Sequence, residues 1–140
     1  MVHFLNRSIK SALVIFGVMT SSTVIIAVFP KFGLECLLQL EFIPSYKILV
    51  QHWGLLIFMT GVMLCISAYK TEWRNPVIIF AVSEKLFIVL LYIGNQESLH
   101  IDGFLIATVV DLFMVSYFVL HLLAKVYAEN SRRGSRWVKR

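Results

Sequence analysis

Three ionisable residues interrupt apolar segments of this sequence, and the chemistry they could perform is the first question that it raises. Glu84 and Lys85 stand side by side in the segment AVSEKLFIVLL, and Asp111 lies in the next apolar segment. A charge at the centre of a bilayer costs at least about 2.5–3.5 kcal/mol on insertion scales, so ionisable residues there are functional candidates by default. They could carry protons or ions, bind a ligand, or pair with one another and lock the helices together.

The positions of Lys85 and Asp111 predict that the two side chains meet. Counted from the ends of their segments at 1.5 Å per helical residue, they lie about 13 Å and about 12 Å deep. Because a hydrocarbon core is about 30 Å thick, both residues fall near its midplane, on consecutive helices. We therefore predict a Lys85–Asp111 ion pair. Glu84 then needs a proton, a second contact to Lys85, or a polar partner such as the hydroxyl tract Thr20–Thr23.

Four further residues are candidate contacts for a ligand or a partner: His52, Trp53, Tyr92 and His121. His52 could bond a quinone, but it and His121 are predicted at opposite membrane faces, so they cannot share a haem. No His, Cys or carboxylate cluster has metal-ligand spacing, and we predict no metal site. Nucleophile, phosphate-loop and dinucleotide motifs are also absent from the sequence. An enzyme is therefore the less favoured class, and no cofactor is predicted, although quinone or lipid stays open as a ligand.

The elements that must position these residues are four apolar segments. The chain has 140 residues, of which 59% are hydrophobic, and its mean hydropathy is +0.80; soluble domains are only about 45–50% apolar. Apolar runs of about 17–25 residues are typical of membrane-spanning helices. They occur at about 11–29, 51–69, 76–94 and 103–124. These lengths predict an all-α fold, a four-transmembrane-helix bundle with up-down-up-down topology.

The first loop, PKFGLECLLQLEFIPSYKILVQ, is unusually apolar. The helical spacing of Leu34, Leu37 and Leu38 predicts a short amphipathic helix that lies in the outer membrane interface. The alternative is an irregular hairpin packed over the bundle. Pro30 is expected to end the first spanning helix, and Pro76 is expected in the first turn of the third.

Lys and Arg residues predict the orientation. They are concentrated before the first helix, between the second and third, and after the fourth, so both termini should be cytoplasmic. We divide the chain into a membrane domain, 1–124, and a basic cytoplasmic tail, 125–140. Anionic lipid is the expected partner of the tail, in preference to nucleic acid or a soluble subunit. Its basic residues are Arg132, Arg133, Arg136, Lys139 and Arg140.

The order of these features resembles a known family, the small four-helix DoxX-like membrane proteins, over about residues 10–124. The residues that carry the resemblance are Phe29-Pro30, Trp53-Gly54, Arg74-Asn75-Pro76, Lys85 and Asp111. Most members have no assigned activity, and some associate with membrane oxidoreductases that feed electrons to quinone. The resemblance implies that Lys85 and Asp111 correspond to the functional positions of the family. The sequence departs from the family at His52, where a basic Arg is more usual.

The sequence thus predicts a non-catalytic integral membrane protein, in a bacterial inner membrane. The leading prediction is an accessory or scaffold subunit packed against larger membrane protein subunits, for example in an electron-transfer or oxidoreductase complex. Its expected partners are those subunits and the lipid bilayer. The alternative is a small transporter or a protein that binds a lipophilic ligand or quinone through Glu84, Lys85 and Asp111. A third prediction is a quinone-linked oxidoreductase subunit that contributes His52.

Overall fold

The computed structural model describes the backbone of residues 2–95 and 102–137, and the side chains of 8–95 and 104–128. These residues are helical with no strand, so the predicted all-α class is confirmed. The elements are α1 (Val2–Ser21), α2 (Val24–Val28), α3 (Pro30–Phe32), the π-helical turn η1 (Gly33–Leu37), the 3-10 turn η2 (Pro44–Tyr46), α4 (Lys47–Tyr69), α5 (Thr71–Gly94) and α6 (Asp102–Trp137).

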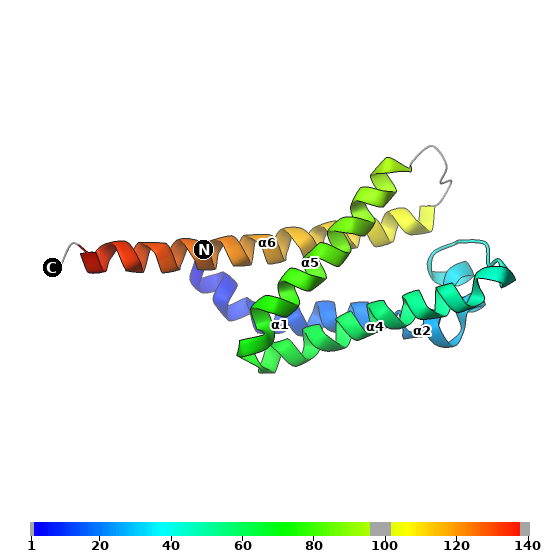
Figure 1. Ribbon diagram of the computed structural model, residues 1–140, viewed down its shortest axis with the longest axis horizontal. Coiled ribbons are helices and arrows are strands. Elements are labelled where there is room, and N and C mark those ends of the chain that lie inside the picture. Colours follow the sequence, from blue (N-terminus) through cyan, green and yellow to red (C-terminus); the bar gives the residue numbers. More distant parts are fainter. Residues whose placement is uncertain (1, 96–101, 138–140) are drawn as a thin grey trace.

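Four segments are long and apolar enough to cross a membrane: Ser8–Val28, Pro44–Tyr69, Thr71–Gly94 and Phe104–Ala128. By length and composition the chain is therefore a multi-pass membrane protein. Helix α1 packs on α4 and α5 packs on α6, and these pairs form a four-helix bundle. Helices α4 and α5 meet at the end where Lys70 joins them, here named the turn end (Figure 1). They diverge toward the opposite end, here named the loop end because it carries residues 30–46.

The first spanning segment is not the single helix that we predicted at 11–29. Helix α1 stops at Ser21 and α2 resumes at Val24. At the interruption, the Ser22 hydroxyl donates to the Met19 carbonyl at 2.7 Å and the Thr23 hydroxyl donates to the Thr20 carbonyl at 2.8 Å. Hydroxyl side chains that bond to nearby carbonyls compete with the regular helix, which accounts for the break.

The first span ends just before Pro30, as predicted, whereas the predicted position of Pro76 is corrected by the structure. Pro30 begins α3 at its first position, after α2 has already ended at Val28; this position suits proline because the missing N–H would have no helical partner. Pro76 lies inside α5 rather than in its first turn, because α5 begins at Thr71. The loop predicted between the second and third spans is reduced to Lys70, whose backbone N–H donates to the Ile66 carbonyl at 2.9 Å.

The loop after the first span contains the predicted short helical segment, as α3 and η1, and it also packs over the bundle. Leu34 and Leu38 are buried with Ile26 in what we name the loop-end cluster. Beyond η1 the chain turns sharply at Gln39, whose φ is 53°. This left-handed conformation is uncommon outside glycine, and it directs the chain back toward η2 and α4.

The last helix is longer than the predicted 103–124, since α6 continues to Trp137. Its 36 residues correspond to about 54 Å at 1.5 Å per residue, which exceeds a bilayer of about 40–45 Å. The C-terminal part of α6 projects beyond the ends of the other long helices (Figure 1). Most of the segment predicted as a tail is therefore helical.

The main core lies in the turn-end half, and we name it the turn-end core. It brings together parts of α1 and α6, the second half of α4 and the first half of α5. Its members, of which those from α1 lie in the middle and second half of that helix, are Ile9, Leu13, Phe16, Leu64, Ala68, Val77, Ile78, Ala81, Met114 and Phe118. The Phe16 ring meets the Phe118 ring edge to face, with centroids 5.5 Å apart, so this half of the bundle is filled by apolar side chains.

Candidate functional site

The three ionisable residues singled out from the sequence form one cluster, near the middle of α5 and in the first third of α6. Lys85 Nζ lies 3.2 Å from Asp111 Oδ1 and 3.9 Å from Glu84 Oε1. The predicted Lys85–Asp111 ion pair is present, and the second contact considered for Glu84 is present as a longer interaction. The cluster therefore contains one ammonium group and two carboxylates, which leaves one formal negative charge in excess.

The helix faces explain this geometry. Lys85 is only 6% exposed and lies on the buried stripe of α5, with Ala81 one turn before it and Val89 one turn after it. Residues four apart share a helix face, and this face packs against α6, where Asp111 lies. Glu84 is rotated by one residue, so its carboxylate lies at the edge of this interface.

Glu84 is the incompletely satisfied member of the cluster. Its Oε2 atom is buried and has no hydrogen-bond partner among the described residues. The hydroxyl tract that we considered as its partner does not reach it: Thr23 Oγ1 donates to the Thr20 carbonyl and, at 3.5 Å, to the Gly54 carbonyl. Buried polar atoms are nearly always paired, so an unpaired carboxylate oxygen is the feature of the cluster that points to a missing donor.

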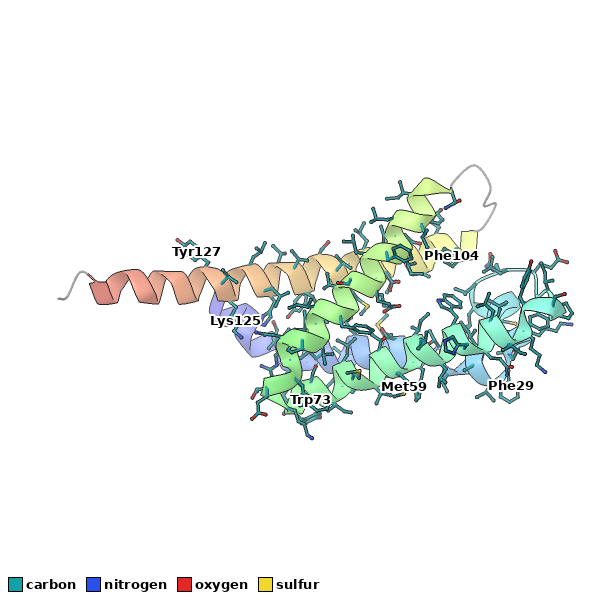
Figure 2. All side chains as sticks on the ribbon, in the orientation of Figure 1. Phe29, Met59, Trp73, Phe104, Lys125 and Tyr127 are labelled. Carbon is teal, nitrogen blue, oxygen red and sulfur yellow. The ribbon has the colours of Figure 1, made fainter. Side chains whose placement is uncertain are left out.

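Glu84 lines a cavity between α4 and α5, here named the lateral crevice, with a volume of about 480 Å³. This volume lies within the range of about 300–1,000 Å³ that is common for small-molecule sites. The Thr60 hydroxyl already donates to the Leu56 carbonyl at 3.1 Å, whereas Glu84 supplies a free carboxylate oxygen. Met59 on α4 is labelled in Figure 2. The lining residues are Trp53, Leu56, Ile57, Met59, Thr60, Met63, Phe80, Glu84, Phe87, Ile88 and Leu91.

A second, smaller cavity lies on the other side of the cluster, and we name it the interior cavity. Its volume is about 190 Å³, and Lys85, Asp111, Thr20 and Thr23 contribute its polar groups. Its volume is below the usual range for ligand sites, but it exceeds the volume of about 30 Å³ that one water occupies in the liquid. Trp53 and Ile57 line both cavities, so they form the wall between them.

The other predicted contact residues lie in different places. His52 is exposed, whereas its neighbour Trp53 is half-buried in the cavity wall. Tyr92 stacks on Phe104, with ring centroids 6.1 Å apart. His121 is buried near the turn end, away from the cavities. The side chains of the tail residues Arg132, Arg133, Arg136, Lys139 and Arg140 lie outside the described residues.

The lateral crevice and the role of Trp53 as a wall do not follow from the sequence pattern. The position of Trp53 near the end of a span favours the membrane interface, where aromatic residues commonly lie. One available signal is the four-residue spacing of Trp53, Ile57 and Thr60-Gly61 along α4. This spacing places them on one face, but it does not reveal that α5 diverges from that face.

The residues suited to hold a ligand are thus Glu84 and the apolar walls of the lateral crevice. In 8–95 and 104–128, no group of three or more His, Cys, Asp or Glu side chains is placed to hold a metal ion. No family model, curated protein or solved structure matches the chain. The resemblance to DoxX-like proteins therefore stays a prediction.

Proposed function

We propose that this membrane protein binds a lipophilic molecule in the lateral crevice and that Glu84 accepts the polar head of that molecule. The observation that carries the proposal is the buried, unpaired Oε2 atom of Glu84 at the wall of an apolar cavity. Because Lys85 is already paired with Asp111, the excess negative charge is available to a ligand. A head group with an amine cation or a hydroxyl donor, as in a long-chain amine or a quinol, complements it.

The arrangement favours a binding pocket over a conduction path. A path across the membrane needs polar groups or water along its whole length. Below the cluster, the turn-end core closes the bundle with apolar side chains such as Leu64, Ile78 and Phe118, each almost fully buried. The cavities lie beside and above the cluster, so the polar groups line a pocket that ends at the midplane. Beside the lateral crevice, the Lys85–Asp111 pair acts as a lock between α5 and α6.

The test compares three twelve-carbon probes that differ in head group: dodecylamine, dodecanol and dodecyl sulfate. A ligand that binds only the folded state raises the midpoint of thermal unfolding. We expect dodecylamine to raise this midpoint above the value with dodecanol, and Glu84→Gln to remove the difference. Glu72→Gln is the matched control, because Glu72 is an exposed carboxylate in the first turn of α5. Equal midpoints with dodecylamine and dodecanol would contradict the proposal.

The accessory or scaffold subunit is the second candidate, and the projecting part of α6 favours it. A single helix outside the bilayer gains little stability alone, because most helical stability in proteins comes from packing. A larger membrane complex, such as an oxidoreductase, or an anionic lipid surface would supply the missing contact. The test is gentle extraction from native membranes, native electrophoresis and mass spectrometry of the band. Migration of the 16.1 kDa chain alone would reject this candidate.

We further propose that the turn end faces the cytoplasm of a bacterial inner membrane, so that both termini are cytoplasmic. The support is the concentration of Lys10, Lys70, Arg74 and Lys125 at the turn end, since Lys and Arg are enriched on the cytoplasmic side. Cys36 is exposed near the loop end and serves as a reporter. A membrane-impermeant thiol reagent should label Cys36 in intact spheroplasts. Labelling of Cys36 only after the membrane is opened would show that the loop end, and not the turn end, faces the cytoplasm.

A further inference from the structure

A basic cluster at the turn end contains two buried nitrogen atoms that have no partner among the described residues. His121 is 3% exposed, and neither its Nδ1 atom nor the Nε atom of Arg74 has a hydrogen-bond partner. Native proteins rarely leave such atoms unpaired, and a bound ion or water commonly satisfies those that lack a protein partner. This cluster is separate from the lateral crevice and plays no part in the function proposed above.

Residues from α5 and α6 converge on the cluster. Lys125 lies one turn after His121 on α6, so the two side chains share a face. Arg74, in the first turns of α5, donates from Nη2 to the Ala68 carbonyl at 3.2 Å. This carbonyl is close to the C-terminal end of α4, where carbonyls lack helical partners. The positive charges of Arg74 and Lys125 both act on the His121 ring.

These two positive charges are not balanced within the described part of the chain. The ion pairs found there both belong to Lys85. The neighbouring lysines at the turn end have aromatic partners instead: the Lys10 ammonium lies over the Tyr69 ring at 4.5 Å, and the Lys70 ammonium lies over the Trp73 ring at 5.4 Å. Arg74 and Lys125 are thus two half-buried cations that both act on His121, and an external anion can neutralise them.

The depth of the pair matches the phosphate level of a bilayer. Arg74 is the fourth residue of one candidate span, Thr71–Gly94, and Lys125 directly follows the apolar residues Leu122-Leu123-Ala124 of α6. Figure 2 places Lys125 at the same end of the bundle as Trp73, the residue before Arg74. Basic sites between membrane helices at this level are suited to phosphate head groups.

We infer that the phosphate of an anionic lipid head group binds between Arg74 and Lys125, above the buried His121 ring. The guanidinium group has N–H donors beyond the one used by the Ala68 carbonyl, and its planar fork suits two phosphate oxygens. Lys125 contributes a point charge from the facing helix. The membrane level of the site favours a lipid over free phosphate, which shares the same chemistry.

The test uses the full chain in lipid nanodiscs of phosphatidylcholine with a small fraction of phosphatidylglycerol. Native mass spectrometry then counts the phosphatidylglycerol retained by the released protein. We expect preferential retention by the wild-type protein and about fivefold weaker retention after Lys125→Gln, since one cation near a membrane surface contributes about that factor. Arg74→Gln should act in the same direction. Lys125→Gln is the primary variant because it removes no hydrogen bond described in the structure.

Two controls distinguish binding of the lipid at this site from nonspecific electrostatic attraction of anionic lipid to the protein. Lys70→Gln removes a cation at the same membrane end and should keep the lipid. Arg132→Gln with Arg133→Gln removes two cations from the predicted tail; it should lose only lipid attracted by the tail and keep the fraction that is sensitive to Lys125→Gln. Retention that survives Lys125→Gln and Arg74→Gln in folded protein, or that is lost only with the tail variant, would overturn the inference. Displacement of the lipid by inorganic phosphate would also overturn it, because the site would then bind a free anion.

Discussion

At the scale of single residues, Lys85 lies close to two carboxylates, and only one of them is at hydrogen-bond distance. Asp111 lies at ion-pair distance from it, on the facing helix, whereas Glu84 is its chain neighbour and lies further away. A buried charge that loses its partner is strongly destabilising, although a whole pair can often be replaced by apolar groups without loss. The lock between α5 and α6 can therefore be separated from the free carboxylate by substitution.

The lock predicts a specific double-mutant cycle. Lys85→Met and Asp111→Asn should each lower the free energy of unfolding by about 3–5 kcal/mol, because each leaves a buried charge without its partner. The double variant should lose much less than the sum. Unfolding of the reconstituted protein by denaturing detergent, followed by circular dichroism, measures the four values. Strictly additive losses would show that the two residues are not coupled.

At the scale of the elements, the close approach of α1 and α4 depends on glycines. A Cβ atom on Gly61 would lie 2.7 Å from the Gly17 carbonyl oxygen and would meet the Ser21 backbone. These contacts are with backbone atoms, which cannot move without separating the helices. Small residues at such positions are typical of membrane helix interfaces.

Gly61→Ala should therefore lower the unfolding free energy by about 1–3 kcal/mol, the usual cost of overpacking. Gly94→Ala is the matched control, since a Cβ atom there would have no neighbour within 4 Å. Thermal unfolding of the two variants in the same detergent gives the comparison. Equal midpoints for the two variants would mean that α1 and α4 are further apart than described.

The spans and the ion pair could be predicted from the sequence, whereas the helix ends and the cavities could not. Depth counting depends only on helical rise, and it put Lys85 and Asp111 at the same level; their 3.2 Å contact agrees with this prediction. The break at Ser22-Thr23 depends on hydroxyl–carbonyl bonds. The extension of α6 to Trp137 lies beyond the apolar pattern. The lateral crevice depends on the divergence of α4 and α5, which no local pattern records.

At the scale of the whole molecule, the bundle has a filled half and a hollow half. The turn-end core fills the half near Lys70, and the two cavities occupy the half near the loop end. The filled half can provide stability while the hollow half accepts a ligand. Substitutions in the two halves should therefore have separable effects on unfolding and on binding.

Adjacent isoleucines on α5 test this division. Ile78 is fully buried in the turn-end core and Ile79 is 55% exposed. Ile78→Ala should lower the unfolding free energy by about 2–5 kcal/mol, the usual range for a buried isoleucine, and Ile79→Ala should change it little. Folded Ile78→Ala should still respond to dodecylamine as the wild-type protein does. Similar losses for both variants would contradict the assigned faces of α5.

The most direct measurement of the central claim uses Trp53 as a reporter of the lateral crevice. The chain has three tryptophans, so Trp73→Phe with Trp137→Phe leaves Trp53 as the single tryptophan, which can be excited selectively over tyrosine. A dodecylamine that carries a bromine atom near its head group should quench it saturably. Glu84→Gln should weaken this binding by at least about tenfold, because a hydrogen bond to a charged group contributes about 1.5–3 kcal/mol. Quenching that is unsaturable, or unchanged in Glu84→Gln, would contradict the binding of an amphiphile by Glu84.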